Sequence, residues 1–106
     1  MIIQTIARVA TLMCGAAISS AALANMELAT QKACMGCHAV DKKLVGPAYK
    51  DVAKKYADQQ GAENTLIASI RKGGAGKWGP IPMPTQAALT DAETKTLATW
   101  ILGGAK

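Results

Sequence analysis

Apolar side chains recur at helical spacing in several segments of the chain, and no stretch alternates with the period of a strand. The first segment follows Asn25, a suitable N-cap, and leads into a pair of cysteines. The third ends at a run of three glycines and an alanine, which stops a helix. The pattern predicts four helices, over about 26–33, 49–57 and 62–72 and from about residue 91.

The last helix has the clearest boundary signal. Thr90 and Glu93 stand three residues apart, which is the spacing of a capping box. Leu97, Trp100 and Ile101 then supply an i, i+3, i+4 apolar face. We expect Trp100 to serve helix packing.

Between the third and last helices, the stretch 73–89 holds four glycines and three prolines and has no period. A segment of this length without secondary structure in a small domain is usually functional or disordered. Trp78, Ile81 and Met83 within it indicate packing against something. The expected fold class is all-α with one long irregular loop.

The first 24 residues are typical of a secretory signal peptide. Arg8 precedes a short apolar stretch, and Ala22-Leu23-Ala24 fits the small-residue cleavage rule. We expect export to the periplasm and cleavage after Ala24, which leaves one domain over 25–106. Cys14 raises a lipoprotein alternative, although the residues before it fit that signal poorly. The apolar stretch is too short for a good membrane span.

The exported part has 82 residues, a size at which a hydrophobic core alone is marginal. A disulfide, metal or cofactor is therefore expected. This part carries eleven basic and seven acidic residues, a formal charge of +4. With so few aromatic residues, the basic excess favours docking to an acidic protein and not nucleic-acid binding.

The candidate chemistry lies in Cys34-Met35-Gly36-Cys37-His38. Two thiols and an imidazole at i, i+3 and i+4 share one face of a helical turn. Both thiols can then reach one porphyrin while the imidazole points at its iron. The C-x-x-C-H motif predicts covalent haem c attachment through Cys34 and Cys37, with His38 as an iron ligand.

Three other readings of the cysteine pair are possible. A Cys34–Cys37 disulfide closes too small a loop to stabilise much. A thioredoxin-like redox pair requires a βαβ context, and no strand is predicted. A zinc site requires four ligands, whereas the exported part has two cysteines and one histidine.

The second iron ligand follows by elimination. His38 is the only histidine, Met35 lies inside the attachment motif, and Met26 precedes it on the same helix. Met83, between two prolines that stiffen the chain, can reach the opposite face of the haem. The alternatives are a core-filling Met83, a lysine ligand or an open distal position. A His/Met pair saturates the iron, so we expect an electron carrier and not an enzyme. A small peroxidase or gas-binding protein would need a labile position.

With these residues in place, the exported part resembles the short bacterial class I cytochromes c, the monohaem carriers of pseudomonads. The matching stretches are Cys34–His38, Val45–Val52, Gly76–Pro84 and Leu97–Leu102. The resemblance implies the cytochrome c fold, about four helices around one haem.

The resemblance also implies residue roles. The carbonyl of Pro47 would accept the Nδ1 proton of His38. The indole N–H of Trp78 would donate a hydrogen bond to a haem propionate. Arg71 or Lys72 would help to neutralise the charge of that propionate. Leu44, Val45, Tyr49, Val52, Tyr56, Leu66, Ile70, Ile81, Leu97 and Ile101 would wall the haem or the core. One departure concerns Thr85-Gln86, where the family commonly has Pro-Asn and the Asn orients the methionine.

We therefore expect a monomeric periplasmic carrier that moves single electrons between transient protein partners with acidic docking faces. Nitrite reductase, cytochrome c peroxidase, a terminal oxidase and a membrane cytochrome complex are candidate partners. A subunit fixed to a membrane complex is the structural alternative, although we expect no stable membrane insertion. The docking ring would comprise Lys32, Lys42, Lys43, Lys50, Lys54 and Lys77.

Overall fold

The computed structural model describes residues 20–106, with side chains from residue 24 onward. Its elements are α1 (Ser20–Gln31), the 3-10 helix η1 (Cys34–Gly36), α2 (Tyr49–Tyr56), α3 (Ala62–Lys72) and α4 (Asp91–Leu102). Extended pairing within this range is limited to an isolated bridge between Gly74 and Met83. The all-α prediction is confirmed. None of the helices from residue 20 onward has the length and apolar character needed to cross a membrane.

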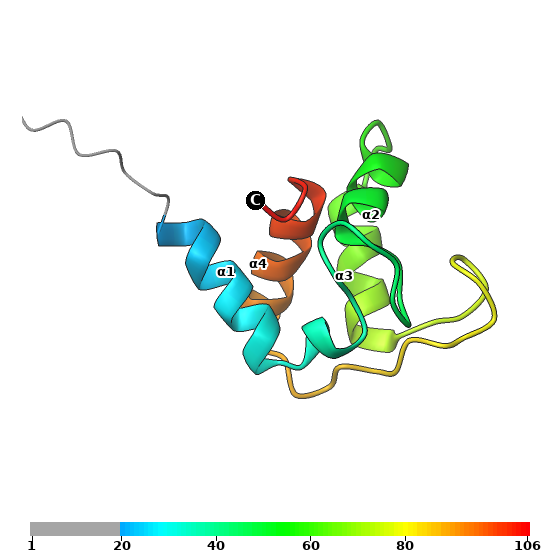
Figure 1. Ribbon diagram of the computed structural model, residues 1–106, viewed down its shortest axis with the longest axis horizontal. Helices are drawn as coiled ribbons and strands as arrows, with labels where there is room; N and C mark the ends of the chain where they lie inside the picture. Colours follow the sequence, from blue (N-terminus) through cyan, green and yellow to red (C-terminus); the bar gives the residue numbers. More distant parts are fainter. Residues whose placement is uncertain (1–19) are drawn as a thin grey trace, which may run out of the picture.

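Helix α4 is the centre of the fold, because α1, α2 and α3 all pack against it. In Figure 1, α1 lies on one side of α4, and α2 and α3 lie on the other. The long loop leaves the end of α3, extends away from the helices, and returns beneath them to α4. Residues of the loop and of the helices together line the cleft described below.

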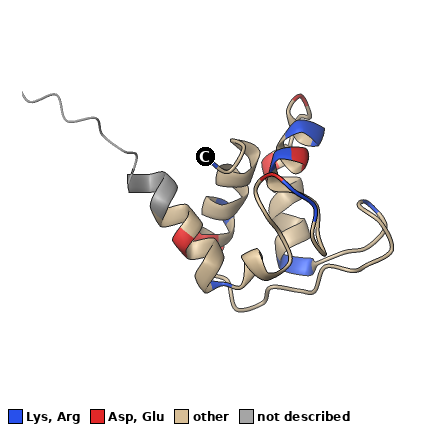
Figure 2. Ribbon diagram, in the orientation of Figure 1, with Lys and Arg blue, Asp and Glu red and all other residues tan. Residues whose placement is uncertain are grey.

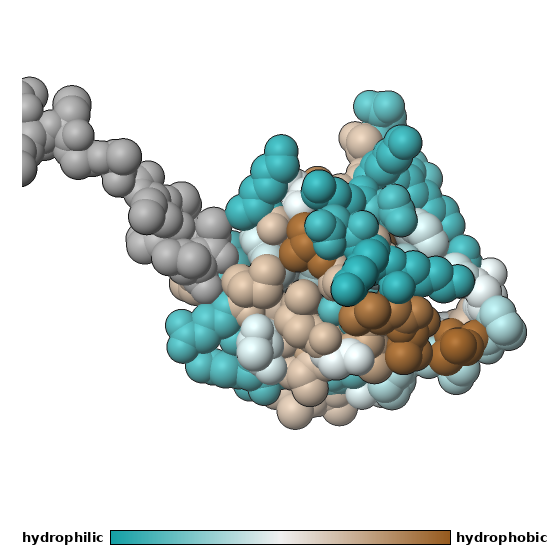
Figure 3. All heavy atoms as spheres, viewed as in Figure 1, coloured by the Kyte–Doolittle hydropathy of each residue, from teal (hydrophilic) through white to brown (hydrophobic). Residues whose placement is uncertain are grey.

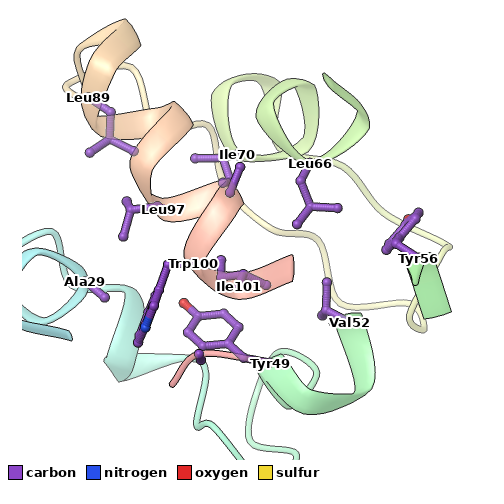
Figure 4. Close-up of a cluster of buried hydrophobic side chains, with 12 residues drawn as sticks. Ala29, Tyr49, Val52, Tyr56, Leu66, Ile70, Leu89, Leu97, Trp100 and Ile101 are labelled. Atoms are coloured by element: carbon purple, nitrogen blue, oxygen red, sulfur yellow. The ribbon is translucent and has the colours of Figure 1, made fainter. Parts of the chain in front are cut away.

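The core is built from the predicted apolar faces of α2, α3 and α4 (Figure 4). Leu97 and Ala98 are almost completely buried, and Trp100 lies between Ala29 and the Tyr49 ring. Ala29 and Ala98 have no exposed surface, and such small side chains let α1 and α4 approach closely. Trp100 packs between helices as expected, although its buried Nε1 has no partner among the described residues.

The capping box predicted for α4 is confirmed. Thr90 Oγ1 accepts the Glu93 N–H at 3.1 Å, and Glu93 Oε1 accepts the Thr90 N–H at 3.0 Å. Lys32 Nζ, from the segment after α1, also lies 3.3 Å from Glu93 Oε2. The Thr90 N–H, and after it Lys32, hold the pKa of the Glu93 carboxyl below its ordinary value.

Helix α1 differs from its prediction at both ends. It already includes Ser20, the first residue described, and the residues between Ser20 and Asn25 are mostly alanine and leucine, which favour helix; Asn25 therefore lies inside the helix and does not cap it. It ends at Gln31, and Ala33 then adopts a left-handed backbone conformation with φ 63°. Of the predicted signal peptide, residues 1–19 lie outside the described part, and the expected cleavage point after Ala24 falls within α1.

Candidate haem-binding site

The C-x-x-C-H motif forms a tight turn. The N–H groups of Cys37 and His38 both donate to the carbonyl of Cys34, at 3.2 and 3.0 Å. The turn places Cys34, Cys37 and His38 in the wall of one cleft, as the spacing predicts. The two thiols are not bonded to each other. Burial raises the pKa of the Cys34 thiol, whereas Cys37 is exposed.

The cleft lies between the helices and the long loop and is lined mainly by apolar side chains. The space between its walls, including the part open to solvent, is about 1210 Å³. Most of the side chains predicted as haem walls line it: Tyr49, Val52, Tyr56, Leu66, Ile70, Ile81, Leu97 and Ile101.

The His38 ring is held by the turn that follows it. Nδ1 lies 2.8 Å from the carbonyl oxygen of Pro47, the contact that the resemblance implies. Since a carbonyl can only accept, Nδ1 carries the proton and Nε2 is left with a free lone pair, the form that binds a metal. Gly46 makes this approach possible, because a Cβ there would overlap the imidazole and lie 2.8 Å from Nδ1.

Tyr49 supports the same imidazole from the core side. Its ring stacks on His38 with centroids 4.9 Å apart and planes 19° from parallel. It also meets Trp100 edge-on, with centroids 5.6 Å apart. Burial, and after it the neighbouring Cys34, raises the pKa of the Tyr49 hydroxyl, which stays protonated. Tyr49 therefore connects His38 to the core, a role that helical periodicity alone did not indicate.

Met83 is half-buried in the wall of the same cleft, on the long loop. Its N–H donates to the Gly74 carbonyl at 2.8 Å and its carbonyl accepts the Gly74 N–H at 3.1 Å. Gly73 has φ +67°, and a Cβ there would overlap the Met83 carbonyl. The glycine pair therefore fixes the backbone of Met83. Neither Met26 nor Met35 lines the cleft, and both pack against the core instead.

Trp78 and Gln86 complete the loop side of the cleft. Trp78 is 37% exposed. Gln86 donates its backbone N–H to Ile70 and its side-chain Nε2 to the carbonyl of Pro84, both at 3.3 Å. The residue that departs from the family pattern thus lies in the same wall as Met83, with its amide bonded to the backbone next to it.

One expectation about the cleft wall is wrong. Leu44 and Val45 do not wall the cleft but are 43% and 51% exposed, because Gly46 donates to the Cys37 carbonyl and turns the preceding residues outward. Arg71 forms an ion pair with Asp91 at the start of α4, and neither Arg71 nor Lys72 lines the cleft; their contact with a haem propionate stays a prediction.

The donor set of the cleft fits haem c and does not fit zinc. Between residues 24 and 106, no three His, Cys, Asp or Glu side chains come together as a metal cluster. The cleft instead offers two thiols, an imidazole with a free Nε2, a thioether and a large apolar wall. These groups suit a covalently attached iron porphyrin with nitrogen and sulfur ligands.

Comparisons with known proteins point the same way. The cytochrome c family model matches residues 25–105. Cytochrome c-552 of Hydrogenobacter thermophilus is 58% identical over 79 residues, which cover 74% of this chain and 80% of that protein. Cytochrome c-551 of Pseudomonas aeruginosa is 58% identical over 71 residues, covering 67% of each protein.

A solved structure agrees with the fold as well. The crystal structure of wild-type Nitrosomonas europaea cytochrome c552 superposes with a TM-score of 0.73 at 47% identity, covering 74% of this chain and 98% of that one. Since the match includes the motif, the helices and the loop with Met83, this chain belongs to the cytochrome c family, and this membership implies a haem c attached covalently through Cys34 and Cys37.

Proposed function

We propose that this protein is a periplasmic carrier of single electrons, with His38 and Met83 as the two iron ligands of its haem. The observation that carries the proposal is that these two side chains line the same cleft as both cysteines. Bound haem supplies a one-electron iron couple, and a His/Met pair raises its reduction potential.

The residues around the two ligands support stable six-coordination. Pro47 fixes the tautomer of His38 that exposes Nε2, and Gly46, which has no Cβ, lets the ring lie close against the turn. The bridge to Gly74 holds the backbone of Met83. With both ligands held by the protein, no position on the iron is left for a substrate, which favours a carrier over an enzyme.

The ligation is tested with haem-loaded protein. We expect the oxidised form to show the sulfur-to-iron charge-transfer band, and Met83→Ala to lose the band and to bind carbon monoxide readily once reduced. Met35→Ala is the matched control, because Met35 lies outside the cleft, and it should keep the band. A wild-type protein that lacks the band and binds carbon monoxide at neutral pH would contradict six-coordination.

The surface supports docking to acidic partners. Lys and Arg gather on α2, on the segment leading into it and at the tip of the long loop (Figure 2). Of the proposed ring, Lys42, Lys43, Lys50, Lys54 and Lys77 are exposed. Lys32 is half-buried and paired with Glu93, so it adds little to the attraction.

Exposed apolar side chains accompany this basic surface. Figure 3 shows hydrophobic atoms at the surface on the side of the long loop. Leu44, Val45 and Ile81 are all more than 40% exposed, and Ile81 also lines the cleft. An apolar contact of this kind ringed by lysines suits a small, transient redox interface, steered by charge and separated easily.

Docking is tested by the rate of electron exchange with a redox protein that has an acidic face. The rate should fall as salt is raised, because at 0.1 M the screening length is only about 10 Å. The double variant Lys42→Glu/Lys43→Glu should be slower, while Lys95→Glu, on α4 and outside the cleft wall, should change the rate much less. A rate independent of salt would count against the lysine ring.

The predicted cleavage after Ala24 is tested by N-terminal sequencing of the exported protein, which should give Asn25 as the first residue.

A further inference from the structure

The tip of the long loop, residues 75–81, stands away from the helices (Figure 1). The base of the loop is well anchored: Met83 pairs with Gly74, the Thr85 hydroxyl donates to Lys72, and the Gln86 N–H donates to Ile70. The backbone hydrogen bond within the tip, from Gly76 to Gly79, does not connect it to a helix. The tip therefore needs another contact to stay over the cleft.

One side chain of α2 reaches this tip. Lys55 Nζ lies 4.4 Å from the centroid of the Trp78 ring and donates to the backbone carbonyl of Lys77 at 3.4 Å. The same ammonium lies 5.8 Å from the ring of Tyr56. In the described part of the chain, no other helix side chain makes a hydrogen bond to residues 75–81. Lys55 is thus a single tie between α2 and the loop tip.

We propose that Lys55 is a positioning residue that latches the loop tip, and with it Trp78, over the haem cleft. The cation lies over the face of the indole, whereas the indole N–H points outward in the ring plane, so the latch leaves that N–H free for the cofactor. The inference rests on the proposed function in one respect, the ligation of iron by Met83. Loosening the loop tip should also loosen Met83, which lies at the other end of the same loop segment.

The neighbouring Lys54 provides a matched control. It is also exposed and on α2, but it makes no polar contact with the loop. Lys55→Met removes the charge and keeps an unbranched stem, Lys54→Met makes the same change of charge one residue away, and Lys55→Arg keeps both the cation and the donor. Both positions are exposed, so the three variants should fold.

The first readout is amide hydrogen exchange at residues 75–81 in the haem-loaded protein. Lys55→Met should speed exchange there by about two- to fivefold. This factor is the free energy of an exposed cation–π contact converted to an equilibrium ratio between the closed and open loop tip. Lys54→Met and Lys55→Arg should leave it at the wild-type rate. Equal acceleration by the Lys54 and Lys55 variants, or none by Lys55→Met, would overturn the latch.

The second readout is the rate at which added imidazole bleaches the sulfur-to-iron band of the oxidised protein. It should rise in Lys55→Met and return to the wild-type value in Lys55→Arg. A rise that Lys55→Arg does not reverse would overturn the latch. If the tip exchanges faster in Lys55→Met but the wild-type protein has no such band, the latch stands and the Met83 ligation proposed above is wrong.

Discussion

Replacing Gly46 by alanine tests how tightly the turn after the C-x-x-C-H motif holds the His38 ring. A Cβ at this position would overlap the imidazole, coming within 2.8 Å of Nδ1 and 2.9 Å of Nε2. The ring cannot swing aside without loss, because Nδ1 is bonded to Pro47 and the other face of the ring stacks against Tyr49. The added methyl group therefore has to displace the ring or the turn.

The expected cost has two parts. Overpacking a filled site costs about 1–3 kcal/mol. Losing the His38–Pro47 hydrogen bond adds about 0.5–1.5 kcal/mol, so we expect Gly46→Ala to lower the free energy of unfolding by about 2–4 kcal/mol. In a domain of this size, that loss corresponds to a fall of at least about 8 °C in Tm.

The assay is denaturant unfolding of the haem-loaded protein, followed by haem absorption and by helical circular dichroism. Gly36→Ala is the matched control, since no heavy atom lies within 4 Å of a Cβ there and its φ is not positive. It should change stability by less than about 1 kcal/mol, in the stabilising direction. If Gly46→Ala unfolds at the same denaturant concentration as Gly36→Ala, the turn does not confine His38 as described.

Three further predictions concern the loop and α4. Thr90→Ala should lower the free energy of unfolding by about 1 kcal/mol in the same assay, because α4 loses its N-cap acceptor, while Thr90→Ser should retain it. The pKa of Glu93 is held below its ordinary value of 4.5, so the ionised carboxylate stabilises the folded protein fully above pH 4.5. This stabilisation is lost as the pH falls through the lowered pKa. Glu93→Gln should therefore flatten the acid side of the stability–pH curve, and an unchanged curve would contradict the pairing. Gly73→Ala should cost about 1–3 kcal/mol and bleach the charge-transfer band at a lower temperature, because its Cβ meets the Met83 carbonyl. Gly76→Ala, which has a left-handed φ but open space around it, separates backbone strain from that overlap.

Much of the site could be predicted, because its residues are close together in the sequence or are few enough in number to leave little choice. The spacing of Cys34, Cys37 and His38 fixes their common face, and a single histidine leaves few choices for the second ligand. The boundaries of α2, α3 and α4 follow from apolar periodicity and from Thr90. Features of this kind depend on neighbours within a few residues, so they can be inferred without knowing the path of the chain.

The rest depended on how loops run in space. Leu44 and Val45 have the composition of wall residues, but a hydrogen bond from the next residue turns them outward. The contact between Lys55 and Trp78 joins residues far apart in sequence, and no local pattern indicates it. Asn25 lies inside α1 because the alanine and leucine residues before it favour helix, and this preference outweighs the capping preference of Asn25.

The pairing of α1 with α4 also sets the order in which the chain can fold. The first and last helices described pack against each other, Ala29 and Ala98 are both fully buried, and α4 supplies the surface on which α2 and α3 pack. During synthesis the N-terminal residues are made first, and this surface is missing until residues 91–102 follow. The contact between α1 and α4 also has to close a loop that contains most of the domain. Folding should therefore be delayed until the chain is nearly complete, and the apolar faces of the helices made first stay exposed until α4 can cover them.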